Sequence, residues 1–227
     1  MRARDSISRI TGEVITCRKC PRLVEWREEA ARNPPARFEA ETYWARPLPG
    51  FGDPRASVLV VGLAPAAHGG NRTGRIFTGD RSGDWLFRAL HRAGFANQPE
   101  SLHRKDGLRL SDCYVAAAVR CAPPSNKPAV GERDNCLPYL QRELAVLRNV
   151  KVIVALGSFA WDCSLKVLKG AGEQPVVPRP RFTHLAEARV GRYLLIGSYH
   201  PSQQNTFTGT LTQKAFDAVF KRVRKGI

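Results

Sequence analysis

Four short runs of β-branched and aliphatic residues constrain the fold of this chain more than any other feature. They cover residues 57–62, 113–119, 151–156 and 193–197. A strand with one face in water alternates apolar and polar residues, whereas a strand of a parallel sheet is buried on both faces and reads as a continuous apolar run. The four runs therefore predict the strands of a parallel sheet.

Segments with helical spacing separate these runs. Large apolar residues recur every three or four positions in residues 83–95, 135–147, 158–169 and 211–223. An alternation of strands and helices is typical of an open α/β sheet with helices on both faces. Residues 171–190 and the segment 33–54, which is rich in proline and aromatic residues, show no period, and we expect both to be irregular.

The unusual sequence lies where such a fold places ligands. Open α/β sheets bind ligands at the carboxyl ends of their strands. The segments that follow the predicted strands are 63–84, 120–128, 157–159 and 198–207. We therefore expect the functional site at this edge of the sheet.

The charge of the chain narrows the class of partner. Its 227 residues contain 36 Lys and Arg against 20 Asp and Glu, a formal net charge of +16. This excess of positive charge favours a polyanionic partner. Nucleic acid is the first candidate, because guanidinium groups bind phosphate oxygens through paired hydrogen bonds. The alternative is a basic surface without a partner.

Composition and length exclude several classes of protein. The 43% of hydrophobic and 25% of charged residues are those of a globular protein rather than of collagen, a coiled coil or a disordered chain. No apolar run is long enough to span a membrane, and residues 1–17 lack the apolar run of a signal peptide. We therefore expect a cytoplasmic protein with reduced thiols, in which cysteines bind metal or pack in the core.

The spacing of the cysteines favours a metal site. A Cys-x-x-Cys pair lets two thiolates reach one centre, and two further cysteines lie at a strand end and near a helix start. The expected ligands are Cys17, Cys20, Cys121 and Cys136. Zinc and an iron–sulfur cluster both accept four thiolates, so the metal stays open at this point. The alternative is that these cysteines pack as small hydrophobic residues, as we expect for Cys113 and Cys163.

A glycine-rich segment follows the first predicted strand. Gly69 and Gly74 have the separation of a phosphate-binding loop, but Arg75 and Ile76 stand where that loop requires Lys and Ser or Thr. A nucleotide triphosphatase is therefore disfavoured. The glycines instead predict a pocket into which Phe77 projects, either to stack on a planar base or to pack in the core.

Three stretches resemble the family 5 (type B) uracil-DNA glycosylases. Residues 62–84 contain GLAPA, GGNRTGR and FTGDRSGD, residues 200–205 read HPSQQN, and residues 114–128 read YVAAAVRCAPPSNKP. The four cysteines proposed above match the cluster ligands of families 4 and 5. The resemblance extends over about residues 15–225.

The resemblance implies a monofunctional DNA glycosylase with a structural 4Fe–4S cluster. It implies a three-layer α/β/α fold with a central four-stranded parallel sheet. The chain would be one domain, residues 1–227, with an N-terminal iron–sulfur-binding segment and long loop at about 15–55. The partner would be DNA that contains uracil or another damaged base, bound by a monomer.

The chain departs from the wider superfamily at two places. Most members carry Asp, Asn or Glu just after the glycine of the first motif, where this chain has Leu63 and Ala64, so Asp80 is the expected carboxylate. Family 4 places a uracil-reading Asn in the strand that holds residues 116–118, which are alanines here. We expect a wider pocket, Asn126 as a partial substitute, and activity on larger or deaminated bases such as hypoxanthine and ethenocytosine.

We assign roles on the model of base flipping. The expected catalytic residues are Asp80, which stabilises the sugar cation and orients water, and His200, which holds the base carbonyl. The expected substrate-binding residues are Gly62, Ala64, Ala66, Phe77 and Asn126. The expected DNA-binding residues are Arg72, Arg75, Arg81, Ser202, Gln203, Gln204 and Asn205, with Lys221 and Arg222 of the last helix as further phosphate contacts.

Each role has a structural alternative. Asp80 could cap the next helix, His200 could pack in the core, Asn126 could serve only a turn, and the last helix could present a merely solvated basic face. Rival functions are a non-catalytic nucleic-acid-binding protein with a structural metal site, an electron-transfer protein, and a relative that traps abasic sites covalently through a histidine.

Overall fold

The four apolar runs form the parallel strands at the centre of the molecule. In the computed structural model, which describes residues 5–227, they are β2 (Val58–Gly62), β3 (Cys113–Ala117), β4 (Val152–Leu156) and β6 (Tyr193–Ser198). They pair in parallel in the order β3-β2-β4-β6. All of their residues are buried, which explains why these strands read as continuous apolar runs. The predicted parallel core is confirmed.

Two short antiparallel strands extend this core at its edges. β1 (Phe51–Gly52) pairs with β3, and β5 (Glu187–Val190) pairs with β6, so that the described residues form one six-stranded sheet in the order β1-β3-β2-β4-β6-β5. The expectation that 33–54 and 171–190 are wholly irregular is therefore wrong. β1 has only two residues, and β5 alternates exposed and buried residues on an edge, so neither produces a strong sequence signal.

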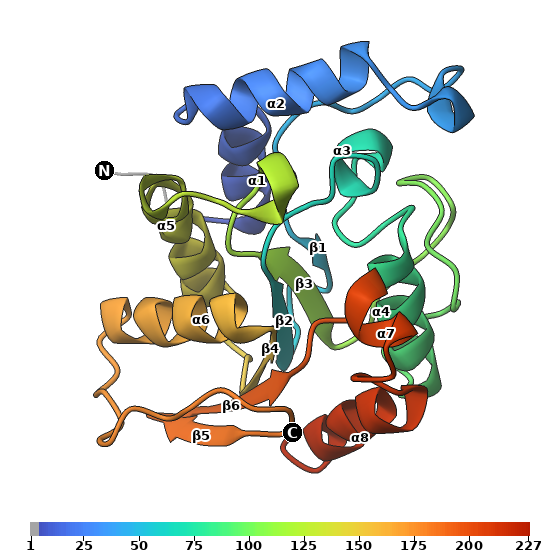
Figure 1. Ribbon diagram of the computed structural model, residues 1–227. Helices are drawn as coiled ribbons and strands as arrows, with labels where there is room; N and C mark the ends of the chain where they lie inside the picture. Colours follow the sequence, from blue (N-terminus) through green and yellow to red (C-terminus); the bar gives the residue numbers. More distant parts are fainter. Residues whose placement is uncertain (1–4) are drawn as a thin grey trace.

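Helices cover both faces of the sheet (Figure 1). α4 (Arg81–Arg92) and α8 (Gln213–Arg224) pack on one face, and α5 (Val130–Val146) and α6 (Ser158–Gly170) on the other. Alternate residues of β2 serve the two layers: Val58 and Val60 contact the α4–α8 side, whereas Leu59 and Val61 contact the α5–α6 side. This arrangement is the predicted three-layer α/β/α fold.

The N-terminal segment adds two helices to this frame. α1 (Ile7–Ile15), which the polar sequence did not predict, packs against α5 through Ile10 and Val14. α2 (Pro21–Arg32) and the short helix η1 (Ala36–Phe38) follow it, and Figure 1 shows α2 close to the end of the sheet where α3 lies. None of the helices in residues 5–227 is long and apolar enough to cross a membrane.

Short helices follow three of the four parallel strands at the carboxyl edge of the sheet. α3 (Gly70–Thr73) follows β2, η2 (Pro124–Asn126) follows β3, and α7 (Gln203–Phe207) follows β6. β2 lies between β3 and β4, so the chain leaves β2 toward one side of the sheet and later returns on the other. This reversal is the topological switch point at which open α/β sheets bind ligands.

Candidate active site

A cavity of about 420 Å³ opens at this switch point. Its walls come from the segments after β2, β3 and β6, which are far apart in the sequence. Most of the predicted site residues line it: Ala64, Ala66, Phe77, Asp80, Arg81, Asn126, His200, Ser202 and Gln203. The cavity is within the size range of small-ligand pockets and has room for a nucleobase.

Phe77 forms the aromatic wall of this cavity. Its backbone is in the left-handed region at φ 52°, which is uncommon for a residue with a large side chain. A Cβ placed on Gly62 would lie 2.5 Å from Cζ of the Phe77 ring, so only glycine fits at the end of β2. The ring stacks on His200 with centroids 5.9 Å apart and planes 30° apart. The two rings together form one wall of the cavity.

Asp80 both caps a helix and lines the cavity. Oδ1 accepts a hydrogen bond of 3.0 Å from the backbone N–H of Gly83, at the N-terminus of α4. Oδ2 lies against the backbone of Gly69, where an added Cβ would come within 2.1 Å of it. Withdrawal from water raises the pKa of Asp80 above its usual value, although the Gly83 N–H opposes this. Capping and catalysis are therefore compatible, because the cap holds the carboxylate at the cavity.

His200 follows β6 and is electrically neutral at physiological pH. Burial lowers its pKa from 6.5 to about 4, because the imidazolium form would lose its hydration. Its backbone carbonyl accepts a 2.9 Å hydrogen bond from Asn205 Nδ2, which holds α7 against the strand end. A neutral imidazole can donate one N–H to a substrate oxygen without bringing a positive charge into the site.

Asn126 lies in a tight turn over the cavity. Both Ser125 and Asn126 have positive φ, at 52° and 56°, in a conformation that Asn tolerates better than most residues. The turn brings Asn126 to the cavity wall. A role in the turn and a role in the pocket are thus combined in one residue.

The segment after His200 forms the short helix α7. Ser202 caps α7 by accepting a hydrogen bond from the N–H of Asn205. Gln203 and Gln204 are exposed, whereas the Asn205 side chain is bound to His200. The side chains of the two glutamines are thus open to solvent, whereas Nδ2 of Asn205 already donates within the chain.

Arg81 lies beside α7 at the mouth of the cavity. Its Nε donates a 2.7 Å hydrogen bond to Thr206 Oγ1, and its guanidinium lies 4.1 Å from the centroid of the Phe207 ring. Phe207 is 63% exposed, an unusual exposure for a phenylalanine. The sequence does not single out Phe207, since only its exposure distinguishes it from a core residue.

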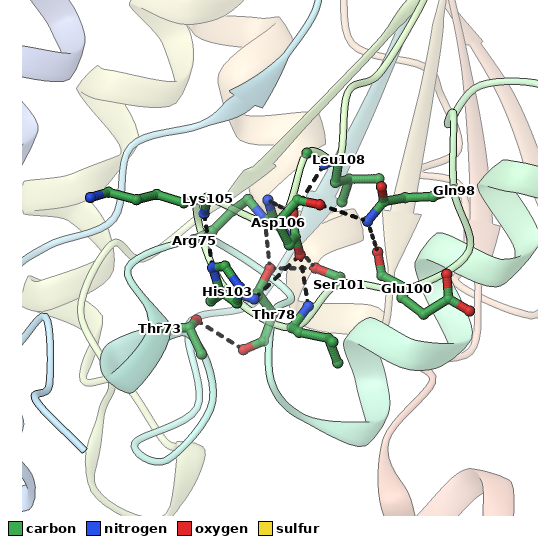
Figure 2. Close-up of polar contacts among 12 residues, drawn as sticks. Thr73, Arg75, Thr78, Gln98, Glu100, Ser101, His103, Lys105, Asp106 and Leu108 are labelled. Carbon is green, nitrogen blue, oxygen red and sulfur yellow. Dashed lines mark hydrogen bonds and ion pairs between the residues drawn. The ribbon is translucent and has the colours of Figure 1, made fainter. Parts of the chain in front are cut away.

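Arg75 is not available for phosphate, contrary to the sequence prediction. Figure 2 shows its guanidinium inside a polar network, paired with Asp106 at 2.6 Å and bonded to Thr78 and Ser101. The pair is almost fully buried and lowers the pKa of Asp106 far below its usual range, together with backbone N–H groups that bind the same carboxylate. Arg75 therefore fixes the glycine-rich segment to residues 98–108 (Figure 2).

Two more arginines that were predicted to bind phosphate are bonded to other groups of the protein. Arg72 bonds Glu41 and the carbonyls of His68 and Gly79, and it lies 4.0 Å from the centroid of the Phe38 ring. Arg222 makes a two-pronged ion pair with Glu187 at 2.6 and 2.7 Å. Lys221, in contrast, is exposed. The last helix therefore presents less unpaired positive charge to a ligand than its sequence indicates.

A second hollow of about 550 Å³ adjoins the cavity. The two share Ala66, Asp80, Arg81, Asn126 and Gln203. The outer walls come from α2, η1 and the segment after β2, and they are aromatic and basic. These outer residues are Trp26, Arg37, Phe38 and His68, of which the sequence did not predict Trp26, Arg37 and Phe38. Aromatic residues interleaved with arginine in the 33–54 segment were the available signal.

The four predicted metal ligands line one small, nearly closed cavity of about 10 Å³. Cys17 follows α1, Cys20 precedes α2, Cys121 follows β3 and Cys136 lies in α5. Among residues 5–227, no three His, Cys, Asp or Glu side chains stand close enough to hold a single metal ion. Cys113 and Cys163 are buried in the two main cores, as predicted.

Comparisons with known proteins agree with this arrangement. Residues 49–224 match the family model described as the uracil DNA glycosylase superfamily. The chain is 49% identical over 217 residues to a type-5 uracil-DNA glycosylase of Thermus thermophilus, which covers 93% of this chain and 94% of the relative. It is 48% identical over 222 residues to a type-5 uracil-DNA glycosylase of Mycobacterium bovis, covering 97% of this chain and 81% of the relative.

A type-4 uracil-DNA glycosylase of Sulfurisphaera tokodaii is more distant, at 31% identity over 97% of this chain and 84% of the relative. The chain belongs to the uracil-DNA glycosylase superfamily, and within it to the type-5 family. The resemblance drawn from the three motifs is confirmed.

Proposed function

We propose that this chain is a monofunctional DNA glycosylase that hydrolyses the N-glycosidic bond of uracil in DNA and leaves an abasic site. Family membership supports the reaction, and one observation supports its location. The cavity at the switch point brings together a carboxylate, a neutral imidazole and an aromatic wall from segments that are separate in the sequence.

Base flipping brings the target into this cavity. A base inside a duplex cannot reach the carboxyl edge of the sheet, so the nucleotide must rotate out of the stack. Phe77 then stacks on the base, and the exposed Gln203 and Gln204 lie beside the opening, where they can enter the vacated space. Arg81 at the same opening can bind a flanking phosphate.

Bond cleavage separates a base anion from a sugar cation. His200 donates an N–H to the base carbonyl on which negative charge develops, with help from the backbone N–H groups near Ala64 and Ala66. Asp80, ionised, stabilises the sugar cation and orients the water that attacks it. Because Asp80 is bound at the start of α4, little rearrangement is needed when the charge forms.

The pocket offers few side chains that can form hydrogen bonds specific to one base. Ala116, Ala117 and Ala118 are buried in or next to β3, and the amide side chains on the cavity wall are those of Asn126 and Gln203. A site with few hydrogen bonds to the base discriminates weakly between bases. We therefore propose activity on uracil together with larger or deaminated bases such as hypoxanthine and ethenocytosine.

We further propose a structural 4Fe–4S cluster bound by Cys17, Cys20, Cys121 and Cys136. The donor set fits, since four thiols line one cavity at the junction of α1, α2, β3 and α5. A zinc ion would draw all four sulfurs to one centre, whereas a 4Fe–4S cluster binds each thiolate at a different iron and keeps them farther apart. The cluster would join the N-terminal helices to the sheet and supply no chemistry to base release.

A cytoplasmic location and action as a monomer remain predictions from the sequence. Both suit a DNA-binding protein with reduced thiols. Size-exclusion chromatography with light scattering, in the presence and absence of DNA, measures the oligomeric state directly.

Single-turnover kinetics on a labelled duplex with one uracil opposite guanine test the proposed function. Alkali after incubation should break the strand at uracil, and a thymine duplex should stay intact. Asp80→Asn keeps a capping side chain but removes the charge, so we expect it to slow base release about 100-fold or more. Asp84→Asn, which removes a carboxylate from the same helix outside the cavity, is the matched control. Full activity of Asp80→Asn would show that a negative charge is not required.

A further inference from the structure

A buried arginine lies against the cysteine cavity. Arg27 of α2 is 2% exposed, and its Nη1 donates to Cys121 Sγ at 3.1 Å and to the carbonyl oxygen of Cys17 at 3.4 Å. Its Nε has no hydrogen-bond partner within the part of the chain that the structure describes. The guanidinium therefore points at the cysteines and not at water.

Among residues 5–227, the charge of Arg27 is balanced only by one long ion pair. Within residues 5–227, the nearest ion-pair partner is Glu28, at 4.0 Å from Nη2. Glu28 is already bonded to Arg18 at 2.6 Å, and a third of its side chain is exposed. A buried cation is costly unless an anion lies against it. The atoms nearest to this cation that can carry negative charge are the cysteine sulfurs.

A second buried arginine beside the same cysteines shows the contrast. Arg120 also lines the cysteine cavity, but it forms a fully buried ion pair with Glu143. Its charge is neutralised inside the protein. Arg27 has no such buried partner among the described residues, so its charge is the one that a metal centre would neutralise.

We propose that Arg27 is the counter-cation of the metal centre and sets its reduction potential and its retention of metal. This inference rests on the cluster proposed above. Four thiolates give a 4Fe–4S centre a net negative charge, which the guanidinium offsets through Cys121. Because a nearby positive charge favours the more negative reduced state, Arg27 raises the reduction potential. Because it also stabilises the thiolate, it slows the loss of iron.

The position of Arg27 is fixed from the active-site side. Asn71, buried in α3, donates from Nδ2 to the carbonyl oxygen of Arg27 at 3.0 Å. The N–H of Asn71 in turn binds the carbonyl of Ala66, which lines the catalytic cavity. α2 is therefore held between the cavity and the metal site, which keeps the guanidinium at Cys121.

The test compares Arg27→Gln with Arg27→Lys and with a matched control. Arg32→Gln removes the same charge from the same helix, at a side chain that is 62% exposed. Iron and sulfide content, the potential from a redox titration followed by electron paramagnetic resonance, and the rate of iron release to a chelator are measured for each. We expect Arg27→Gln to lower the potential and to release iron about tenfold faster than the unmodified protein. Arg27→Lys should keep the potential and release iron at an intermediate rate, and Arg32→Gln should change neither.

An unchanged potential and an unchanged release rate in Arg27→Gln would overturn the proposal. If that variant is insoluble, Arg27→Met is measured in its place, because it has similar length and no polar atoms to bury, and the same outcomes decide. Absence of iron and sulfide from the unmodified protein would refute both the cluster and this role of Arg27. Uracil release by the same preparation reports on the glycosylase separately.

Discussion

The burial of His200 predicts how much stability the folded protein loses as the pH falls. Burial holds its pKa at about 4 in the folded protein, whereas histidine in an unfolded chain titrates near 6.5. As the pH falls below 6.5, the unfolded chain takes up a proton that the folded protein refuses, so stability is lost down to about pH 4. Between pH 7.5 and 4.5 this difference amounts to roughly 2.5 kcal/mol.

Comparison with His200→Asn isolates this contribution. Burial also lowers the pKa of His68 and His184. Both residues are present in the two proteins, so their contributions to the pH dependence of stability cancel in the difference. Native-state hydrogen exchange of the buried amides of β4 measures the free energy of opening without removing the metal. We expect the unmodified protein to lose about 2.5 kcal/mol more than His200→Asn over this pH range.

A nuclear magnetic resonance titration of the histidine ring provides the direct control. The resonance that disappears in His200→Asn should titrate near pH 4. A midpoint near 6.5, with equal loss of stability in the two proteins, would refute the argument from burial. His200 would then be partly charged at neutral pH, and its role as a neutral donor would be wrong.

Three further substitutions test the geometry of the site. Gly69→Ala should slow single-turnover base release about 100-fold, because the new methyl meets Oδ2, Cγ and Cβ of Asp80 and displaces the side chain that also caps α4. Asp106→Asn should destabilise the protein by about 3–5 kcal/mol in hydrogen exchange, because it leaves the buried Arg75 without its anion; a loss under 1 kcal/mol would contradict this. Arg81→Ala should weaken DNA binding and reduce by about one the slope of log affinity against log salt in fluorescence anisotropy; an unchanged slope would exclude a phosphate contact.

The sequence predicted the centre of the fold better than its edges. Strands buried on both faces leave an unbroken apolar signal, which is why the four parallel strands were found. β1 is two residues long and β5 has only one buried face, so their existence depends on pairing with β3 and β6 rather than on their own residues. α1 was missed because only Ile10 and Val14 of its nine residues are buried.

The sequence predicted those site residues whose location follows from the order of strands in the sheet. Asp80 and His200 come after the ends of β2 and β6, and the parallel sheet brings them to one cavity. Arg72 and Arg75 were misassigned because arginines in a glycine-rich segment are typical of phosphate binding. Their true partners are carboxylates 31 residues away in the sequence, before and after the segment, and no local pattern reveals them.

Intact-mass spectrometry of a single turnover tests the central claim most directly. An oligonucleotide duplex with one uracil is mixed with excess protein, and both strands and the protein are weighed. We expect the uracil strand to lose its base, to gain the water that replaces it and to stay uncut, free uracil to appear, and the protein mass to be unchanged. Bound DNA with no change of mass would identify a non-catalytic binding protein, and a protein that gains the mass of the strand would identify covalent trapping; either result would contradict hydrolysis by Asp80 and His200.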